Sequence, residues 1–275
     1  MTAPTTGAHA GTGRRRFVAP LREQVDAARF RHPLFEGFGE YLDLVTAARW
    51  PDIEDLNARM PLSGPRFVMQ DAALLADGLH YEARIAQGRI ATRAENWHDL
   101  FNAMVWMRHP ILKQALNRQQ CREVARWGTR ERGPAQQALT QFDESGVIVQ
   151  LRDTSLLDLW DRHDWQALFH ANAGRWRDGG IAVVAVVGHA LMEQALVPGR
   201  LLVGKCLVVP GDLADGVAHV AESMAAGATL AAPSELRPLP LAGIPGWHAE
   251  QCEAFYAQAD YFRPLRERRV YPRPW

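Results

Sequence analysis

The stretch from Thr92 to Asn117 constrains the fold more than any other part of this chain. Thr92 and Glu95 have the spacing of a capping box, which predicts that a helix begins there. Eight of the twelve residues from 96 to 107 are apolar, and they would cover most of the circumference of that helix. Such a helix is usually buried on most sides, so its narrow polar stripe is either its one solvent-facing side or the lining of a site. The polar stripe consists of Glu95, His98, Asp99 and Asn102, with Trp106 in the same arc.

Proline and glycine residues mark where several other elements begin and end. Pro110 ends or kinks the central helix, and a second helical pattern follows it. Pro134 fits the first position of a later helix, and Gly146 fits the left-handed position just past its end. The alternative for this later segment is a hairpin that turns at residues 143–146. Further helices are predicted over residues 41–48, 52–59, 155–161, 164–177, 189–197 and 214–226.

Apolar and alternating segments predict the strands. Residues 181–187 are continuously apolar and rich in β-branched side chains, which is typical of a strand covered on both faces. Residues 81–92 alternate between apolar and polar side chains around a Gln-Gly turn, so they are predicted as a hairpin that leads into the central helix. Further strands are predicted over residues 66–70, 147–151 and 201–209.

These elements together indicate an α+β fold, in the form of a mostly helical single domain with a small mixed β-sheet. The domain is expected to span residues 17–275, after a leader at residues 1–16 that is small, polar and basic and is expected to be disordered. Residues 238–275 are rich in proline and aromatic side chains. We expect them to form a C-terminal tail that packs on the body of the domain.

Composition and charge exclude several classes of function. The chain has 31 basic and 31 acidic residues, and a formal net charge of zero argues against a general binder of nucleic acid or acidic membranes. The three cysteines form no CxxC motif, so neither a disulfide framework nor a thiolate zinc site is expected. The longest apolar run has seven residues, too few to span a bilayer. We therefore expect a cytoplasmic protein with no membrane partner.

Three pairs of neighbouring polar residues are candidates for metal binding or acid–base chemistry. They are His98 with Asp99, Asp143 with Glu144, and His189 with Glu193. His189 and Glu193 are four residues apart and therefore share one helix face. His189 would lie in the first turn of a helix that follows a buried strand. The helix dipole at that position keeps an imidazole neutral, as a metal ligand or a base must be.

The three pairs supply two imidazoles and up to four carboxylates, a set that suits Zn, Mn, Fe or Mg with one position left for water. The sequence therefore favours a metal-dependent hydrolase acting on a phosphodiester or a related anionic substrate. The candidate metal ligands are His98, Asp99 and His189, and the candidate catalytic carboxylates are Asp143, Glu144 and Glu193. The candidate substrate-binding residues are Arg84, Arg93, Asn96 and Asn102.

Two other functions stay open. The same residues could form a buried polar network that fixes the fold of a non-enzymatic interaction or structural protein. In that case His98 and Asp99 would only cap a helix, and His189 would be a core histidine held by a carboxylate. The third possibility is nucleic-acid binding through an arginine face, although such a face is more often simply solvated. The arginine face consists of Arg122, Arg126, Arg130 and Arg132 around Trp127.

Several strings in the chain resemble a bacterial protein family known as domain of unknown function 3025. The most specific string is NWHDLFNA, followed by TQFDESGV and GHALMEQ, and the resemblance extends over roughly residues 30 to 265. It implies a bacterial single-domain protein and supplies no catalytic residues. The polar residues inside these strings include His98, Asp143 and His189. The strings therefore overlap the three pairs reached from helix geometry.

Overall fold

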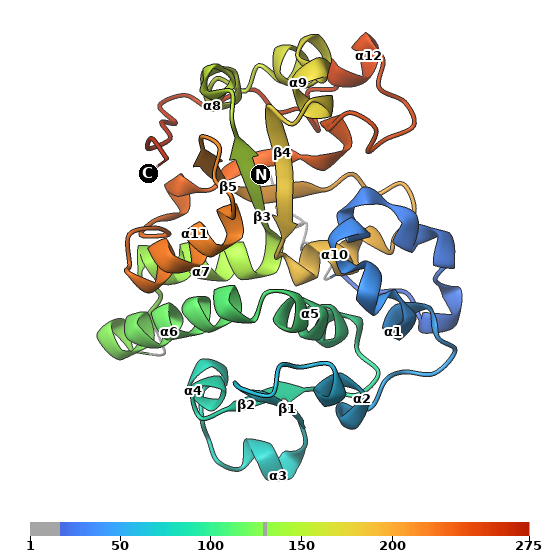
Figure 1. Cartoon of the computed structure of the whole chain (residues 1–275), viewed down its shortest axis with the longest axis vertical. Coiled ribbons are helices and arrows are strands. Elements are labelled where there is room, and N and C mark those ends of the chain that lie inside the picture. Colours follow the sequence, from blue (N-terminus) through green and yellow to red (C-terminus); the bar gives the residue numbers. More distant parts are fainter. Residues whose placement is uncertain (1–16, 129–130, 275) are drawn as a thin grey trace, which may run out of the picture.

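Helices α5 (Trp97–Arg108) and α6 (Pro110–Trp127) lie across the middle of the molecule in the computed structural model, which describes residues 17–128 and 131–274 (Figure 1). The predicted leader at residues 1–16 lies outside the described residues. Pro110 occupies the first turn of α6, so the predicted break between two helices is confirmed. The apolar side chains of α5 are buried, as its composition predicts.

The central helix α5 begins later than the predicted capping box. Asn96 is its cap, because its side chain accepts a hydrogen bond of 3.0 Å from the backbone N–H of Asp99. Thr92 is instead the last residue of strand β2 (Arg89–Thr92), and Glu95 has a positive φ of 51°. The predicted start at Thr92 is therefore wrong, since Thr92 belongs to a sheet and Asn96 supplies the cap.

A small layer lies on the far side of α5 and α6 from the main sheet, at the bottom of Figure 1. It holds β2 and strand β1 (Arg66–Met69), which pair in parallel, and helix α4 (Tyr81–Ala86). The predicted hairpin over residues 81–92 is thus wrong in its first half. Tyr81 and Ile85 share one face in a strand and also in a helix, so the alternation alone could not decide. The nearby helices are α1 (Leu42–Thr46), α2 (Ile53–Ala58) and α3 (Ala72–Leu75).

Within the described residues, the main sheet has the strand order β4-β3-β5-β6. The strands are β3 (Gly146–Leu151), β4 (Ile181–Val186), β5 (Val203–Pro210) and β6 (Arg237–Pro240). β3 pairs in parallel with β5 and antiparallel with β4, so the predicted mixed sheet and α+β fold are confirmed. β3 is buried along its whole length, whereas β4 is an edge strand with a half-buried middle. The prediction that residues 181–187 form the strand covered on both faces is therefore wrong, since that strand is β3.

Gly188 allows the end of helix α7 (Pro134–Ser145) to touch the start of helix α10 (His189–Ala195), and Gly146 allows the chain to pass from α7 into β3. A Cβ atom at Gly188 would lie 2.5 Å from Cα of Ser145, and one at Gly146 would lie 2.2 Å from the carbonyl oxygen of Phe142. Gly146 has an extended φ of −69° and begins β3, so its predicted left-handed conformation is wrong. The predicted helix over this segment is confirmed, and the alternative hairpin is excluded. The close contact sets His189 beside the last turn of α7.

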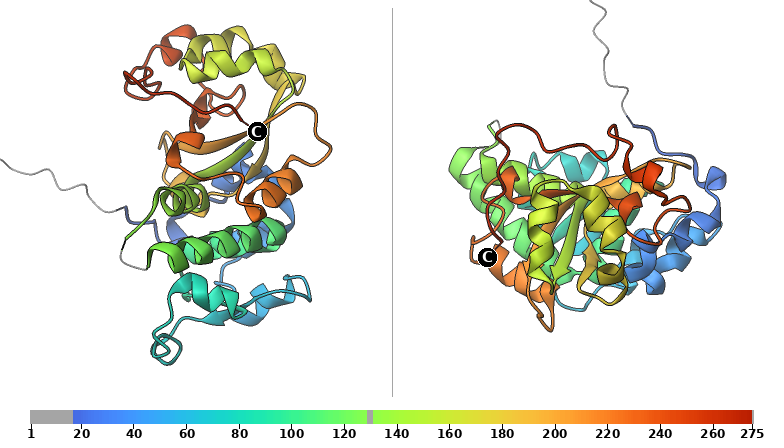
Figure 2. Two further views of the ribbon diagram at one scale, coloured as in Figure 1. Left: turned by 90° about the vertical axis from the view of Figure 1, so that its left-hand side faces the viewer. Right: turned by 90° about the horizontal axis from the view of Figure 1, so that it is seen from above.

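The C-terminal tail packs on the body, as predicted. Phe255, Tyr256, Phe262 and Tyr271 are buried, and the hydroxyl of Tyr261 donates a 2.6 Å hydrogen bond to the carbonyl of Leu202. Figure 2 shows the resulting layers from the side, with the tail and the helices near residues 157–177 covering the sheet. The remaining helices are α8 (Leu157–Asp161), a π-helix (Gln166–Ala171), α9 (Ala173–Arg177), α11 (Gly216–Ala225) and α12 (Glu253–Tyr256). Along the described ranges, no helix is both long and apolar enough for a membrane crossing.

Candidate functional site

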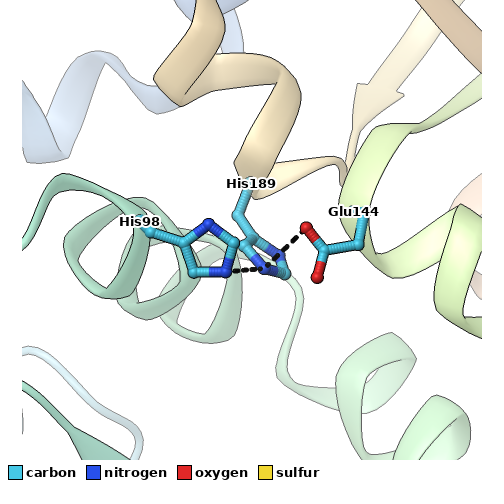
Figure 3. Close-up of side chains that lie close together, drawn as sticks. All are labelled: His98, Glu144 and His189. Carbon is cyan, nitrogen blue, oxygen red and sulfur yellow. Dashed lines mark hydrogen bonds and ion pairs between the residues drawn. The ribbon is translucent and has the colours of Figure 1, made fainter. Parts of the chain in front are cut away.

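Three side chains from three different helices meet between α5, α7 and α10 (Figure 3). His98 lies in the first turn of α5, His189 is the first residue of α10, and Glu144 lies in the last turn of α7. The Nε2 atoms of the two histidines are 3.0 Å apart, and Oε2 of Glu144 lies 3.8 Å from Nε2 of His189. One ligand atom from each residue lies within 4.8 Å of the other two. The three side chains can therefore reach one metal ion.

The second nitrogen of each imidazole faces a carboxylate. Nδ1 of His98 lies 3.2 Å from Oε2 of Glu193, and Nδ1 of His189 lies 4.0 Å from Oδ1 of Asp143. Nδ1 of His189 is buried and makes no hydrogen bond of normal geometry to the described residues. When both Nδ1 atoms carry the proton, the two Nε2 lone pairs face each other. A proton or a cation must then lie between them.

Burial and charge act differently on the two imidazoles. Burial lowers the pKa of His189 to about 3, so this ring is neutral near pH 7, as a metal ligand must be. Burial also acts to lower the pKa of His98, but the hydrogen bond to Glu193 and the charge of Glu144 outweigh it and raise that pKa. His98 is therefore the more basic of the two imidazoles.

A buried lysine fixes the carboxylate behind His189. Nζ of Lys113 hydrogen-bonds to Asp143 and, at 2.9 Å, to Oδ1 of Asn102, whose amide donates a 3.0 Å hydrogen bond to the hydroxyl of Tyr81. Burial acts to raise the pKa of Asp143, but the charge of Lys113 outweighs it and lowers that pKa. Asp143 therefore stays ionised beside His189. The network joins α4, α5, α6 and α7.

A cavity of about 310 Å³ lies beside the imidazole pair. Its lining combines both histidines, the carboxylates of Asp143 and Glu144, and neutral polar side chains from α6 and α7. A second cavity of about 750 Å³ is also lined by His98, together with aromatic side chains that include Trp50 and Trp97. His98 thus forms part of the wall of both cavities, and the imidazole pair is accessible to a small molecule.

The described structure brings together a subset of the residues predicted for the site. This subset is His98, His189, Asp143, Glu144 and Glu193. Asp99 is engaged elsewhere, because it accepts hydrogen bonds from the backbone N–H, Nε and Nη2 of Arg93 at 2.6, 3.0 and 2.7 Å. Arg93 still lines both cavities.

The other predicted polar residues have partners within the protein. Asn96 caps α5, and Asn102 holds Lys113. Arg84 binds the carboxylate of Asp77 at 2.5 Å and does not belong to the cavity lining. Arg84 therefore serves the fold, whereas Asn96 also lines the second cavity beside His98, and Asn102 lines the first.

The predicted arginine face is only partly a free surface. Arg122 donates a 2.9 Å hydrogen bond to the carbonyl of Ala225, and the guanidinium of Arg126 lies 5.4 Å from the ring centre of Trp127. Arg132 lines the cavity beside the imidazole pair. Arg130 lies outside the described residues.

Several residues around the site were not predicted as site residues from the sequence. Lys113 could have been found, because it is one of only two lysines in a chain with 31 basic residues. Tyr81 and Gln136 both line the cavity, and Tyr81 also accepts a hydrogen bond from Asn102. A tyrosine or a glutamine within a helical pattern does not by itself indicate a site.

Comparison with known proteins gives one family and no individual relative. The family model described as Protein of unknown function (DUF3025) matches residues 65–266, a range that contains His98, Glu144 and His189. The search of curated proteins and the search of solved structures give no match. The family match covers most of the chain and agrees with the strings that suggested it. The chain therefore belongs to the DUF3025 family.

Proposed function

We propose that the protein is a metal-dependent hydrolase that cleaves a phosphodiester or a related anionic substrate. His98, His189 and Glu144 would hold one divalent metal ion. The observation that carries this proposal is the contact between two imidazole Nε2 atoms, 3.0 Å apart, with a carboxylate oxygen 3.8 Å away from one of them. Two imidazoles and one carboxylate are a common ligand set of hydrolytic zinc sites.

The spacing of the donor atoms supports a metal. Zinc–nitrogen bonds of about 2.0–2.1 Å separate two ligand nitrogens by about 2.9 to 3.4 Å, depending on the angle at the metal. The 3.0 Å between the histidine Nε2 atoms falls in this range. Oε2 of Glu144 lies 3.8 Å from Nε2 of His189, about half an ångström beyond this range. The carboxylates of Glu193 and Asp143 behind the two rings are the usual partners of metal-bound histidines.

The chain's own residues would divide the remaining work. A bound divalent ion supplies a water molecule with a lowered pKa as the nucleophile. Glu193 orients His98, and Asp143, kept ionised by Lys113, faces His189. The guanidinium of Arg93 is held by Asp99 at the wall of the cavity, where it would bind the anionic group of the substrate.

The first experiment combines metal analysis with a hydrolysis assay. Purified protein is loaded separately with Zn, Mn, Fe and Mg, dialysed, and assayed with bis(p-nitrophenyl) phosphate. We expect about one equivalent of one metal and metal-dependent release of p-nitrophenol. His98→Ala and His189→Ala should lose both, whereas His170→Ala, a change at an exposed histidine, should keep both. A protein that binds none of the four metals would contradict the proposal.

A second candidate function is a non-enzymatic interaction protein, and the buried network around Lys113 supports it. Tyr81, Asn102, Lys113 and Asp143 satisfy one another across four helices, as expected of groups that fix a fold. This reading accounts for Lys113 and Asp143. An interaction role does not explain why the Nε2 atoms of the two histidines face each other, so we rank this function second.

A further inference from the structure

The cavity continues along one face of α7, away from the imidazole pair. Gln136, Thr140, Asp143 and Glu144 all line it, and their spacing of four, seven and eight residues places them on one helix face. At 1.5 Å per residue, the distance from Glu144 to Gln136 along the helix axis is about 12 Å. A molecule of two linked groups can therefore lie along α7 with one group at each end.

The end of the cavity near Gln136 is lined by the amide and hydroxyl side chains of Gln120, Gln136 and Thr140, and Arg132 also belongs to the cavity lining. Gln120 donates a 3.3 Å hydrogen bond to the hydroxyl of Thr140, which donates at 2.9 Å to the backbone carbonyl of Gln136. Gln120 and Gln136 are 5% and 6% exposed. Oε1 of Gln136 is buried and has no hydrogen-bond partner among the described residues. A buried acceptor without a partner is costly, so this end is suited to a ligand that donates a hydrogen bond.

The carboxyl group of Glu82 favours a neutral ligand group at this end of the cavity. Burial and the nearby charge of Asp143 raise the pKa of Glu82, which also lines the cavity, to about 7. The ammonium group of Lys113 is already bound by Asp143 and Asn102. A neutral hydroxyl group, which both donates and accepts, satisfies Gln136 and Glu82 without introducing a new charge.

We propose that Gln120, Gln136, Thr140 and Glu82 form a second subsite that binds the hydroxyl groups of a polyol. The substrate is then a phosphodiester of a polyhydroxylated alcohol, with its phosphate at the imidazole pair and its hydroxyl groups at Gln136. The identity of the phosphodiester rests on the proposed function. The polyol subsite rests on its own observation, the unpartnered Oε1 of Gln136.

Two diesters of equal charge test the subsite directly. The methyl phosphodiester of sorbitol carries hydroxyl groups along a six-carbon chain that can extend toward Gln136, and methyl hexyl phosphate lacks them. Isothermal titration of the wild-type protein, metal-loaded and metal-free, should show that the hydroxylated diester binds more tightly by about tenfold, since one buried acceptor gains a partner. Gln136→Leu and Thr140→Val should reduce this preference to near unity. Gln137→Leu, the same change at the exposed neighbouring residue, should retain it.

The outcomes separate the two proposals. Equal binding of the two diesters, no binding of either at millimolar concentration, or a preference that survives in Gln136→Leu would overturn the subsite. Metal uptake and hydrolysis without a preference would overturn the subsite and leave the proposed function intact. A preference in a protein that takes up no metal would support the subsite and remove the metal-dependent hydrolase. Thermal melts of each variant show that a lost preference is not caused by unfolding.

Discussion

Each histidine of the site faces a carboxylate, but the two nitrogen–oxygen distances differ. Glu193 hydrogen-bonds to Nδ1 of His98 at 3.2 Å, whereas Asp143 lies 4.0 Å from Nδ1 of His189. Burial lowers the pKa of His189 to about 3, whereas the hydrogen bond to Glu193 and the charge of Glu144 outweigh burial and raise the pKa of His98. A metal at the two Nε2 atoms therefore competes with a proton chiefly on His98. Metal affinity should fall as the pH falls through the raised pKa of His98, that is, beginning above 6.5.

Removal of the charge behind His98 should weaken metal binding. Glu193→Gln keeps the shape of the side chain but loses the carboxylate that orients the ring, and such changes reduce metal affinity by about 10- to 100-fold. Glu222→Gln, a change at an exposed glutamate on α11, should have no effect. Competitive titration with a chelator of known affinity measures the difference. Equal affinities in the two variants would show that Glu193 does not support a metal ligand.

Glu82 should make the stability of the protein depend on pH. Its folded-state pKa is raised from 4.5 to about 7, so the folded protein holds a proton that the unfolded chain releases. This stabilising contribution is fully present below pH 4.5 and is lost as the pH rises through about 7, with a total of about 3 kcal/mol. Glu82→Gln should therefore be more stable than the wild type above pH 7 and similar to it near pH 4.5. Urea unfolding across this pH range measures the difference, with Glu36→Gln at an exposed residue as the control. If the free energy of unfolding of both variants depended on pH as in the wild type, the prediction would be contradicted.

At the scale of elements, the site depends on how closely α7 and α10 approach each other. Gly188 lies against Ser145, and both backbone N–H groups at Val187 and Gly188 donate hydrogen bonds of 2.9 Å to the carbonyl of Gly146. This contact sets the first residue of α10, His189, next to Glu144. The approach of α10 to α7 therefore requires a residue without a Cβ atom at Gly188, although this glycine takes no part in the chemistry of the site.

Alanine at Gly188 should separate the two helices, and alanine at Gly146 should distort the last turn of α7, which carries Glu144. A new Cβ would lie 2.2 Å from the Phe142 carbonyl in Gly146→Ala and 2.5 Å from Cα of Ser145 in Gly188→Ala, and backbone atoms must shift to avoid it. We expect each change to lower the free energy of unfolding by about 3 kcal/mol and to abolish metal binding. Gly174→Ala, where the new Cβ meets nothing within 4 Å, should change it by less than about 1 kcal/mol. Equal stability of all three variants would show that the close approach is not required.

The helices and their boundaries at proline could be predicted from the sequence, whereas the pairing of the strands could not. The apolar α5, the proline at the start of α6 and the helix before β3 follow from residue types within a few positions of one another. The start at Thr92 and the hairpin after Tyr81 failed because β1, a distant segment, takes β2 as its partner. The left-handed conformation of Gly146 failed because the glycine is needed for space and not for its φ angle.

At the scale of the whole molecule, the site is assembled from segments that are far apart in the sequence. His98 and His189 are 91 residues apart, and Lys113 and Asp143 are 30 residues apart. The sequence identified the imidazoles and carboxylates by their chemistry. Their meeting depends on the parallel pairing of β3 with β5 and on the packing of α10 against α5 and α7, which no local pattern contains. The subsite around Gln136 could not be predicted, because glutamine and threonine side chains become unusual only when they are buried.

The network around Lys113 should contribute to the stability of the whole domain. Lys113 and Asp143 are 3% and 17% exposed, and loss of one partner of such a pair leaves an uncompensated charge. Lys113→Met should therefore lower the free energy of unfolding by about 3–5 kcal/mol. Lys205→Met, the same change at the other lysine of the chain, should have a much smaller effect. Similar losses in the two variants would show that the network does not hold the four helices together.

X-ray absorption at the metal edge tests the central claim most directly, because it reports the atoms bound to the metal. For zinc-loaded protein near pH 7, we predict two imidazole nitrogens, with oxygen ligands from Glu144 and water completing the shell. His98→Ala and His189→Ala should each remove the imidazole signal or the metal itself. A spectrum with oxygen ligands alone, or a protein without bound metal after loading, would contradict the account and leave the two histidines as a pair that shares only a proton.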